Sequence, residues 1–239
     1  MRIPARTVGI VGGISPESTI EYYRHLIAEY RAGLPAGDER YPLVVIDSID
    51  LTRLVDLMEA GALDAVTDYL VGEVARLAAA GAGAAALAAN TPHIVFEGIR
   101  RRAPIPMISL VEATCEAAAA LGVKRVGILG TRFTMQGSFY PEVFSRRGIE
   151  VVAPEAADQD DLHERYMTEL VHGVFRPETR ERLLAIAGRL HERRRAEAIV
   201  LAGTELPLIL PEAPDLAVPL LDTTRIHVRR IAAWMLSGV

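Results

Sequence analysis

Cysteine is nearly absent from this chain of 239 residues, which contains one, Cys115. A single thiol cannot form a disulfide within its own subunit, so counting alone excludes any mechanism that needs two thiols in one subunit. Cys115 lies in the alanine-rich run VEATCEAAAAL, and this setting favours a packed thiol over a reactive one.

Long apolar runs and a surplus of positive charge are also missing. No stretch approaches the roughly 20 residues of a membrane span, and the start MRIPARTVGIVGG carries no cleavable signal pattern. We therefore expect a cytoplasmic protein without a membrane partner. The net charge is −5, from 26 basic and 31 acidic residues, so we expect no nucleic-acid partner.

Nucleotide and metal motifs are absent as well. GIVGGIS lacks the spacing of a dinucleotide-binding loop, and no G-x-x-x-x-G-K-[ST] sequence occurs. The six histidines show neither an H-E-x-x-H spacing nor a cysteine neighbour, so the sequence predicts no metal site.

What the chain does contain is an alternation of short runs rich in Val, Ile and Leu with longer helical patterns. This alternation predicts an α/β fold in which mainly parallel sheets are flanked by helices. We expect strands at 7–12, 41–48, 84–90, 105–110, 125–130, 149–154, 196–205 and 217–222. We expect helices at 18–31, 51–61, 63–81, 94–102, 112–121, 135–148, 161–175, 179–194 and 223–236.

The order of elements occurs twice. Gly9 and Asn90 are 81 positions apart, and Gly127 and Thr204, their counterparts in the second half, are 77 apart. Such a repeat indicates an internal duplication that gives two pseudo-symmetric lobes. We expect lobe 1 to comprise residues 1–110 plus about 217–239, and lobe 2 about 111–216, with segments exchanged between the lobes.

Loops of small polar residues follow the expected strands. Ligands of open α/β sheets bind at the carboxyl ends of the strands, where these loops supply N–H groups and hydroxyls suited to a carboxylate. The loops are GGISPEST, SIDLTR, AANTPH, GTRFTMQGS and AGTELP. We therefore expect a small anionic ligand between the lobes.

Each loop residue taken alone has a second interpretation. Ser15, Ser18, Thr131 and Thr134 have the residue types of helix caps. His93 is either a donor that braces its loop or an acid/base group, and Glu205 is either a carboxylate at a helix entry or a pocket group that orients a partner.

Six motifs occur in order along nearly the whole chain: GGISPESTIEYYR, NTPH, LGTRFTM with FYPEVF, PEAADQDDLH, GTELPLILPE and PLLDTTRIHVRRIAAWML. Together they resemble the aspartate/glutamate racemase family, and more closely its branch of aspartate racemases and broad amino-acid racemases. The resemblance implies an isomerase that needs no cofactor, a homodimer, and a small amino or dicarboxylic acid bound between two lobes.

The resemblance also implies two catalytic cysteines, one just before the Asn of NTPH and one just before the Thr of GTEL. Those positions here hold Ala89 and Gly203. A methyl group and a hydrogen atom offer no base for a weakly acidic α-proton, so the two-thiol racemisation of the family does not run in its usual form.

For a divergent member of this family, the candidate acid/base groups are His93 and Glu205. The substrate-binding candidates are Ser15, Glu17, Ser18, Arg53, Asn90, Thr91, Thr131, Thr134 and Thr204. A lysine that often meets a substrate carboxylate is replaced by DQDDLH, which contains Asp158, Asp160 and Asp161. The ligand then has one carboxylate, or a cationic group near Asp161.

Three functions fit these departures. The first is an isomerase or lyase acting on a small carboxylate through His93 and Glu205. The second is a protein that binds an amino acid and does not turn it over. The third is slow racemisation through water or a single base.

Overall fold

The computed structural model describes residues 6–211 and 216–237. The first five residues and Glu212, which closes the motif GTELPLILPE, lie outside this part. The chain divides into two compact units. Unit 1 contains the chain up to Leu110 and again from His227, and unit 2 runs from Val111 to Ile226.

Unit 1 has a four-stranded sheet in the order β2-β1-β3-β4, with every neighbouring pair parallel. Its strands and helices are β1 (Thr7–Gly12), α1 (Pro16–Ala32), β2 (Leu43–Ser48), α2 (Leu51–Glu59), α3 (Leu63–Ala79), β3 (Ala84–Leu87), the 3-10 turn η1 (Thr91–Val95), α4 (Phe96–Arg102), β4 (Met107–Ile108) and the later part of α11 (Thr223–Leu236).

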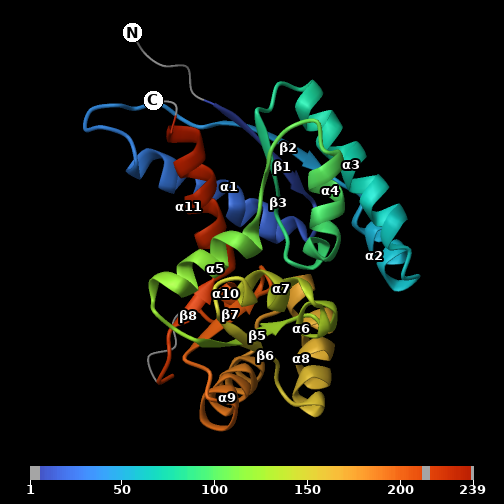
Figure 1. Ribbon diagram of the computed structural model, residues 1–239, viewed down its shortest axis with the longest axis vertical. Coiled ribbons are helices and arrows are strands. Elements are labelled where there is room, and N and C mark those ends of the chain that lie inside the picture. The colour runs from blue at the N-terminus through green and yellow to red at the C-terminus, as the bar shows by residue number, and fades with distance from the viewer. Residues whose placement is uncertain (1–5, 212–215, 238–239) are drawn as a thin grey trace. The chain divides into compact units, whose positions relative to one another are not determined.

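Alternation along the strands of unit 1 separates two apolar faces. Val11 and Leu87 pack with the apolar sides of α2, α3 and α4 in one core cluster. Figure 1 shows α3 and α4 beside the strands of this sheet. On α1, Tyr22, Leu26 and Tyr30 recur at a spacing of four and are buried, as expected of a helix with one face in a core.

Unit 2 repeats the arrangement with the order β6-β5-β7-β8, again parallel throughout. Its elements are α5 (Leu110–Ala120), β5 (Arg125–Gly130), α6 (Arg132–Gln136), α7 (Phe139–Ser145), β6 (Glu150–Val152), α8 (Ala156–Thr168), the 3-10 turn η2 (Leu170–His172), α9 (Pro177–Arg194), β7 (Ala198–Ala202), α10 (Leu206–Ile209), β8 (Leu220–Asp222) and the start of α11. Leucines and isoleucines of α8 and α9 form a core cluster with Leu129, Ile199 and Leu201.

The predicted α/β class and the two lobes with parallel sheets are confirmed. The predicted return of the chain to lobe 1 near residue 217 is wrong, because the chain stays in unit 2 through Ile226. The reason is that β8 pairs with β7, and the Thr223 hydroxyl then donates to the Leu201 carbonyl at 2.8 Å.

Two expected helices are shorter than predicted. The helix at 135–148 is divided into α6 and α7 at Gly137, whose backbone is extended at φ −71 and ψ 150. A Cβ at Gly137 would lie 2.6 Å from Cε1 of Phe139, so only glycine fits this break without a shift. The helix at 161–175 begins earlier, at Ala156, and ends at Thr168, where η2 follows.

The duplication extends to one packing detail. Gly9 is the third residue of β1 and Gly127 is the third residue of β5. A Cβ at Gly9 would lie 2.9 Å from Cβ of Leu77 on α3, and one at Gly127 would lie 2.9 Å from Cδ1 of Leu190 on α9. In each unit, the lack of a side chain lets a long helix pack close to the first strand.

We predict that Gly127→Ala lowers the free energy of unfolding by about 1 to 3 kcal/mol, because the added methyl overpacks the β5–α9 contact. Gly188→Ala is the matched control: Gly188 is a helical glycine of α9 with open space around its Cβ position, so alanine there should stabilise by about 0.5 to 1 kcal/mol. Urea denaturation of both variants checks the pair, and equal effects would contradict the packing account.

Candidate functional site

The order of the strands marks one place on each sheet for a ligand. From β1 the chain continues to β2 on one side, and from β3 it continues to β4 on the other, so the connections diverge between β1 and β3. The same holds between β5 and β7 in unit 2. In open parallel sheets, ligands bind beside such a switch point at the carboxyl ends of the strands.

Backbone hydrogen bonds hold the strand-end loops of unit 1 together. The Ile49 N–H, after β2, donates to the Gly12 carbonyl at 3.1 Å, and the Ala88 N–H, after β3, donates to the Val11 carbonyl at 2.9 Å. The loops after β1, β2 and β3 therefore meet at one edge of the sheet.

The loop after β1 is the most constrained of the three. Gly13 has φ +77, and a Cβ there would lie 2.8 Å from the Ile49 backbone. Its N–H donates to the Thr19 hydroxyl at 2.8 Å. Ser15 also has a positive φ, +63, which is uncommon outside glycine, and it is the residue before α1.

Ser15 stands out by its hydroxyl. Its side chain makes no capping bond to α1, its relative exposure is 6%, and its Oγ finds no hydrogen-bond partner within the described residues. The capping interpretation therefore fails for Ser15. A buried hydroxyl without a partner is costly, and a ligand oxygen above the N-terminus of the 17-residue helix α1 would satisfy it.

The loop after β3 carries Ala89, Asn90 and His93, all of which are buried. The imidazole of His93 stacks on Phe96, with ring centroids 4.7 Å apart. Its Nδ1–H donates to the Ala89 carbonyl at 3.0 Å, and its Nε2 accepts the Leu110 N–H at 3.2 Å. Both ring nitrogens of His93 hold backbone groups, which leaves no lone pair free to act as a base.

A second buried histidine mirrors the first. His227 of α11 donates from Nε2 to the Ile108 carbonyl at 3.0 Å, and its Nδ1 accepts the Tyr22 hydroxyl at 3.0 Å. His93 and His227 thus bind neighbouring backbone groups at the end of β4, with their rings 6.5 Å apart. Burial lowers the pKa of His93 to about 4 and that of His227 to about 3, so both are neutral at pH 7.

The remaining candidates of unit 1 differ in exposure. Ser18 is buried, Thr91 is half-buried, and Glu17 is exposed on the first turn of α1. Arg53, on the first turn of α2, is exposed and its guanidinium lies 4.3 Å from the ring centroid of Tyr69. The structure therefore brings Ser15 and Asn90 to neighbouring loops and leaves Glu17 and Arg53 at the surface.

In unit 2 the loop after β5 carries Thr131 and Thr134. Thr131 precedes α6 but makes no side-chain capping bond, and its Oγ1 lies 3.2 Å from that of Thr134. A Cβ at Gly130 would lie 2.6 Å from the Ala202 carbonyl oxygen, so glycine allows β5 and β7 to end side by side. Thr131 thus begins its loop beside Gly203.

The loop after β7 contains a cluster of buried polar groups that sequence reasoning did not find in full. Tyr166 of α8 donates its hydroxyl hydrogen to Glu205 Oε2 in a short hydrogen bond, and Thr204 Oγ1 donates to the same oxygen at 3.0 Å. Glu205 is 2% exposed and Tyr166 is 4% exposed. Tyr166 was missed because it follows Leu162 at a spacing of four, the pattern of a core residue.

The three aspartates of DQDDLH each contact an arginine. Asp158 accepts two hydrogen bonds from Arg189, Asp160 pairs with Arg132, and Asp161 bridges two arginines, Arg165 at 2.9 Å and Arg182 at 2.8 Å. These arginines hold the pKa of Asp161 below its usual value despite the opposing effect of burial. A ligand cation would compete with two guanidinium groups at Asp161, so this candidate contact is weakened.

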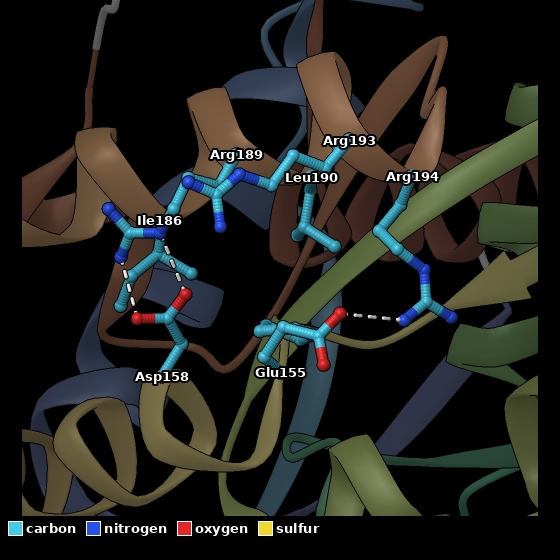
Figure 2. Close-up of a pocket in the computed structure, with 8 residues that line it drawn as sticks. Glu155, Asp158, Ile186, Arg189, Leu190, Arg193 and Arg194 are labelled. Atoms are coloured by element: carbon cyan, nitrogen blue, oxygen red, sulfur yellow. Dashed lines mark hydrogen bonds and ion pairs between the residues drawn. The ribbon is translucent and has the colours of Figure 1, made fainter.

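A hollow in unit 2 lies elsewhere. It is lined by Pro154 and Glu155, which precede α8, and by residues of α8 and α9, and it contains the ion pairs Asp158–Arg189 and Glu155–Arg194 (Figure 2). The Arg194 carbonyl accepts from Arg125 at the start of β5, which places the hollow toward the amino end of the sheet. The chemistry of the strand-end loops makes them the better candidate site.

Other chemistries find little support. Over residues 6–211 and 216–237, no group of three His, Cys, Asp or Glu side chains lies close enough to hold a metal ion. Cys115 is buried on α5, its Sγ lies 3.8 Å from the Val143 carbonyl oxygen, and burial raises the pKa of its thiol. None of the described helices is long and apolar enough to cross a membrane.

Two units with parallel sheets and small polar loops at their switch points are typical of α/β proteins that bind small molecules. Comparison with known proteins identifies the family. The family model described as Asp/Glu/hydantoin racemase matches residues 11–231, and the chain belongs to that family.

Relatives match over nearly full length. The broad specificity amino-acid racemase RacX of Bacillus subtilis (strain 168) is 25% identical over 221 residues, which are 91% of this chain and 92% of the relative. The structure of an aspartate racemase homologue from Pyrococcus horikoshii OT3 is 32% identical with a TM-score of 0.81, covering 96% of this chain and 99% of the other. A candidate Asp/Glu racemase from Yersinia pestis is 29% identical with a TM-score of 0.88, covering 97% and 100%.

The two neutral histidines predict a pH dependence. Unfolded histidine binds a proton near pH 6.5, whereas His93 and His227 in the fold bind one only near pH 4 and pH 3. Their contribution is fully present above pH 6.5. As pH falls below 6.5, each histidine lowers the free energy of unfolding by about 1.4 kcal/mol per pH unit until its folded pKa is reached.

Urea denaturation at pH 7.5 and at pH 5 measures how much the free energy of unfolding falls between the two pH values. His93→Gln should remove about half of this fall. His172→Gln, a change on the exposed turn η2, should leave the fall unchanged. A free energy of unfolding that does not change between the two pH values would contradict neutral, buried histidines.

Proposed function

We propose that this protein binds a small amino acid or dicarboxylic acid at its strand-end loops, and that any chemistry there is isomerase-type proton transfer at the α-carbon without a cofactor. The observation that carries the proposal is the buried Ser15 hydroxyl, which lacks a partner above the N-terminus of α1. Family membership supports the ligand class and the isomerase chemistry.

In this proposal the strand-end loops of each unit offer ligand contacts: the loops after β1 and β3 in unit 1, and the loops after β5 and β7 in unit 2. In unit 1, Ser15 and the first N–H groups of α1 hold one carboxylate, and Ser18 of α1 is a further candidate contact. The other binding residues are Asn90, Thr91, Thr131, Thr134 and Thr204. Glu17 and Arg53 are exposed, and each remains a candidate contact for a ligand group of opposite charge. The homodimer remains a prediction.

Standard two-thiol racemisation does not fit this chain. Ala89 offers a methyl group, and the space beside Gly203 is filled by Tyr166. His93 is an unsuitable base, since both of its ring nitrogens hold backbone groups. These features also favour a second candidate, a protein that binds an amino acid and does not turn it over.

Ser15→Gly tests the carboxylate contact. The substitution removes a hydroxyl without a partner in the fold and relieves a positive φ, so the free energy of unfolding should stay the same or rise by up to about 1 kcal/mol. Affinity for aspartate should fall about 10- to 100-fold, the value of one hydrogen bond to a charged group. Calorimetric titration with L- and D-aspartate measures it.

The matched control is Ser145→Ala, at the exposed end of α7, where the hydroxyl donates to the Glu142 carbonyl, and this change should leave the affinity unchanged. Unchanged affinity in a folded Ser15→Gly protein would count against this hydroxyl as a ligand contact.

Restoring the thiols tests whether the loops still present an amino acid to the family positions. The combination Ala89→Cys with Gly203→Cys should be destabilised by about 1 to 3 kcal/mol, because a Cβ at 203 would lie 2.5 Å from the Tyr166 hydroxyl oxygen. Adding Tyr166→Ala makes room. The triple variant should racemise aspartate, followed by polarimetry, and a variant that combines Tyr166→Ala with only one of the two cysteines should not.

Absence of racemisation in a folded triple variant, with the thiols introduced at 89 and 203 both titratable, would show that these loops no longer present the α-carbon to these positions.

A further inference from the structure

Tyr166 occupies the space that a side chain at position 203 would take. A Cβ at Gly203 would lie 2.5 Å from the hydroxyl oxygen of Tyr166, 2.6 Å from its Cε2 and 2.9 Å from its Cζ. The phenol comes from α8 and reaches the carboxyl end of β7 from a distant part of the chain. A hydroxyl group therefore lies at this strand end, although the residue at the strand end itself has no side chain.

The hydroxyl of Tyr166 is joined to a buried carboxylate. It donates to Glu205 Oε2, which also accepts from the Thr204 hydroxyl at 3.0 Å. Burial first, and then the negative charge of Glu205, raise the pKa of Tyr166 well above its usual value. At neutral pH the phenol thus keeps its proton, directed at an oxygen that can receive it.

Filling space does not by itself explain this arrangement. A phenylalanine would fill the volume beside Gly203 equally well, and a carboxylate that is 2% exposed is costly to bury. The aspartates of α8 described above pair with arginines, whereas Oε2 of Glu205, in the loop after β7, accepts from two hydroxyl groups. A carboxylate bonded to a phenol at a switch point has the composition of a proton relay.

We propose that Tyr166 and Glu205 form an acid–base pair that acts on one face of the α-carbon of a bound amino acid. The proposal rests on the proposed function, because it needs the ligand at the strand-end loops. As the α C–H bond breaks, its proton passes to the Tyr166 oxygen while the phenol proton passes to Glu205 Oε2. The electron pair of that bond moves into the enolate of the ligand carboxylate, and the reverse transfer reforms the C–H bond.

The loop after β3 offers no counterpart to this pair. Ala89 ends in a methyl group, and the ring nitrogens of His93 are bonded to the Ala89 carbonyl and the Leu110 N–H. With one acid–base pair, a proton leaves and returns on the same face. The α-proton of one enantiomer then exchanges with solvent while its configuration is retained, and the other enantiomer does not exchange.

Proton NMR in heavy water tests this inference on the full chain. L- and D-aspartate, and separately L- and D-glutamate, are incubated with the protein, and loss of the α-proton signal is followed against a protein-free control. Chiral chromatography of the same samples detects inversion. We expect exchange in one enantiomer of the accepted amino acid, with no accumulation of its mirror image.

Tyr166→Phe should reduce this exchange about 100-fold or more, since it removes the proton-transferring atom and keeps the ring. Glu205→Gln should reduce it similarly. Tyr140→Phe is the matched control: Tyr140 is a buried tyrosine of α7 whose hydroxyl bonds to Thr114, and its loss should leave exchange unchanged. Calorimetric titration of each variant shows whether binding persists.

Several results would overturn the acid–base pair: no exchange although aspartate or glutamate binds, equal exchange of both enantiomers, or full exchange in a folded Tyr166→Phe protein. Retained binding in those cases would leave the proposed function in place. If none of the four amino acids binds, the proposed function itself fails, and the role of the pair fails with it.

Discussion

The parallel pairing of β1 with β3, and of β5 with β7, is the constraint on which the candidate site depends. Val11 of β1 pairs with Leu87 of β3, and this register brings the loops of Ser15 and Asn90 to one edge of the sheet of unit 1. Gly130 of β5 pairs with Ala202 of β7, which does the same for Thr131 and Gly203 in unit 2. Such a sheet needs helices packed close on its faces. Gly9 and Gly127 allow that approach in the two units.

The two units use similar loops in different ways. In unit 1 the buried polar side chain after β3, His93, is bound to backbone at both nitrogens and so fixes the position of the loop and of the end of β4. In unit 2 the corresponding loop holds a carboxylate, Glu205, that accepts a hydrogen bond from the phenol of Tyr166. The imidazole of His93 is therefore held by structural bonds, whereas Tyr166 and Glu205 are the pair that we propose for proton transfer.

The strands and the loops that follow them were predictable from the sequence. Runs such as TVGIVG and RVGILG identify the strands, and the Gly, Ser and Thr that follow them identify the loops. Contacts between distant residues were not predictable. Tyr166 has the spacing of a core residue and meets Glu205 from 39 positions away, and His227 bonds to Tyr22 across 205 positions. The pairing of Asp161 with Arg182 on another helix is likewise invisible in DQDDLH.

The two positions at which the resemblance implies cysteines have different surroundings. Tyr166 fills the space beside Gly203, while Ala89 presents a methyl group. The central claim is that the strand-end loops hold a small carboxylate. A crystal structure with bound L- or D-aspartate tests this most directly. The account predicts a ligand carboxylate hydrogen-bonded to the Ser15 hydroxyl at the N-terminus of α1, and aspartate found only away from the strand ends, for instance in the hollow beside Arg189, would contradict it.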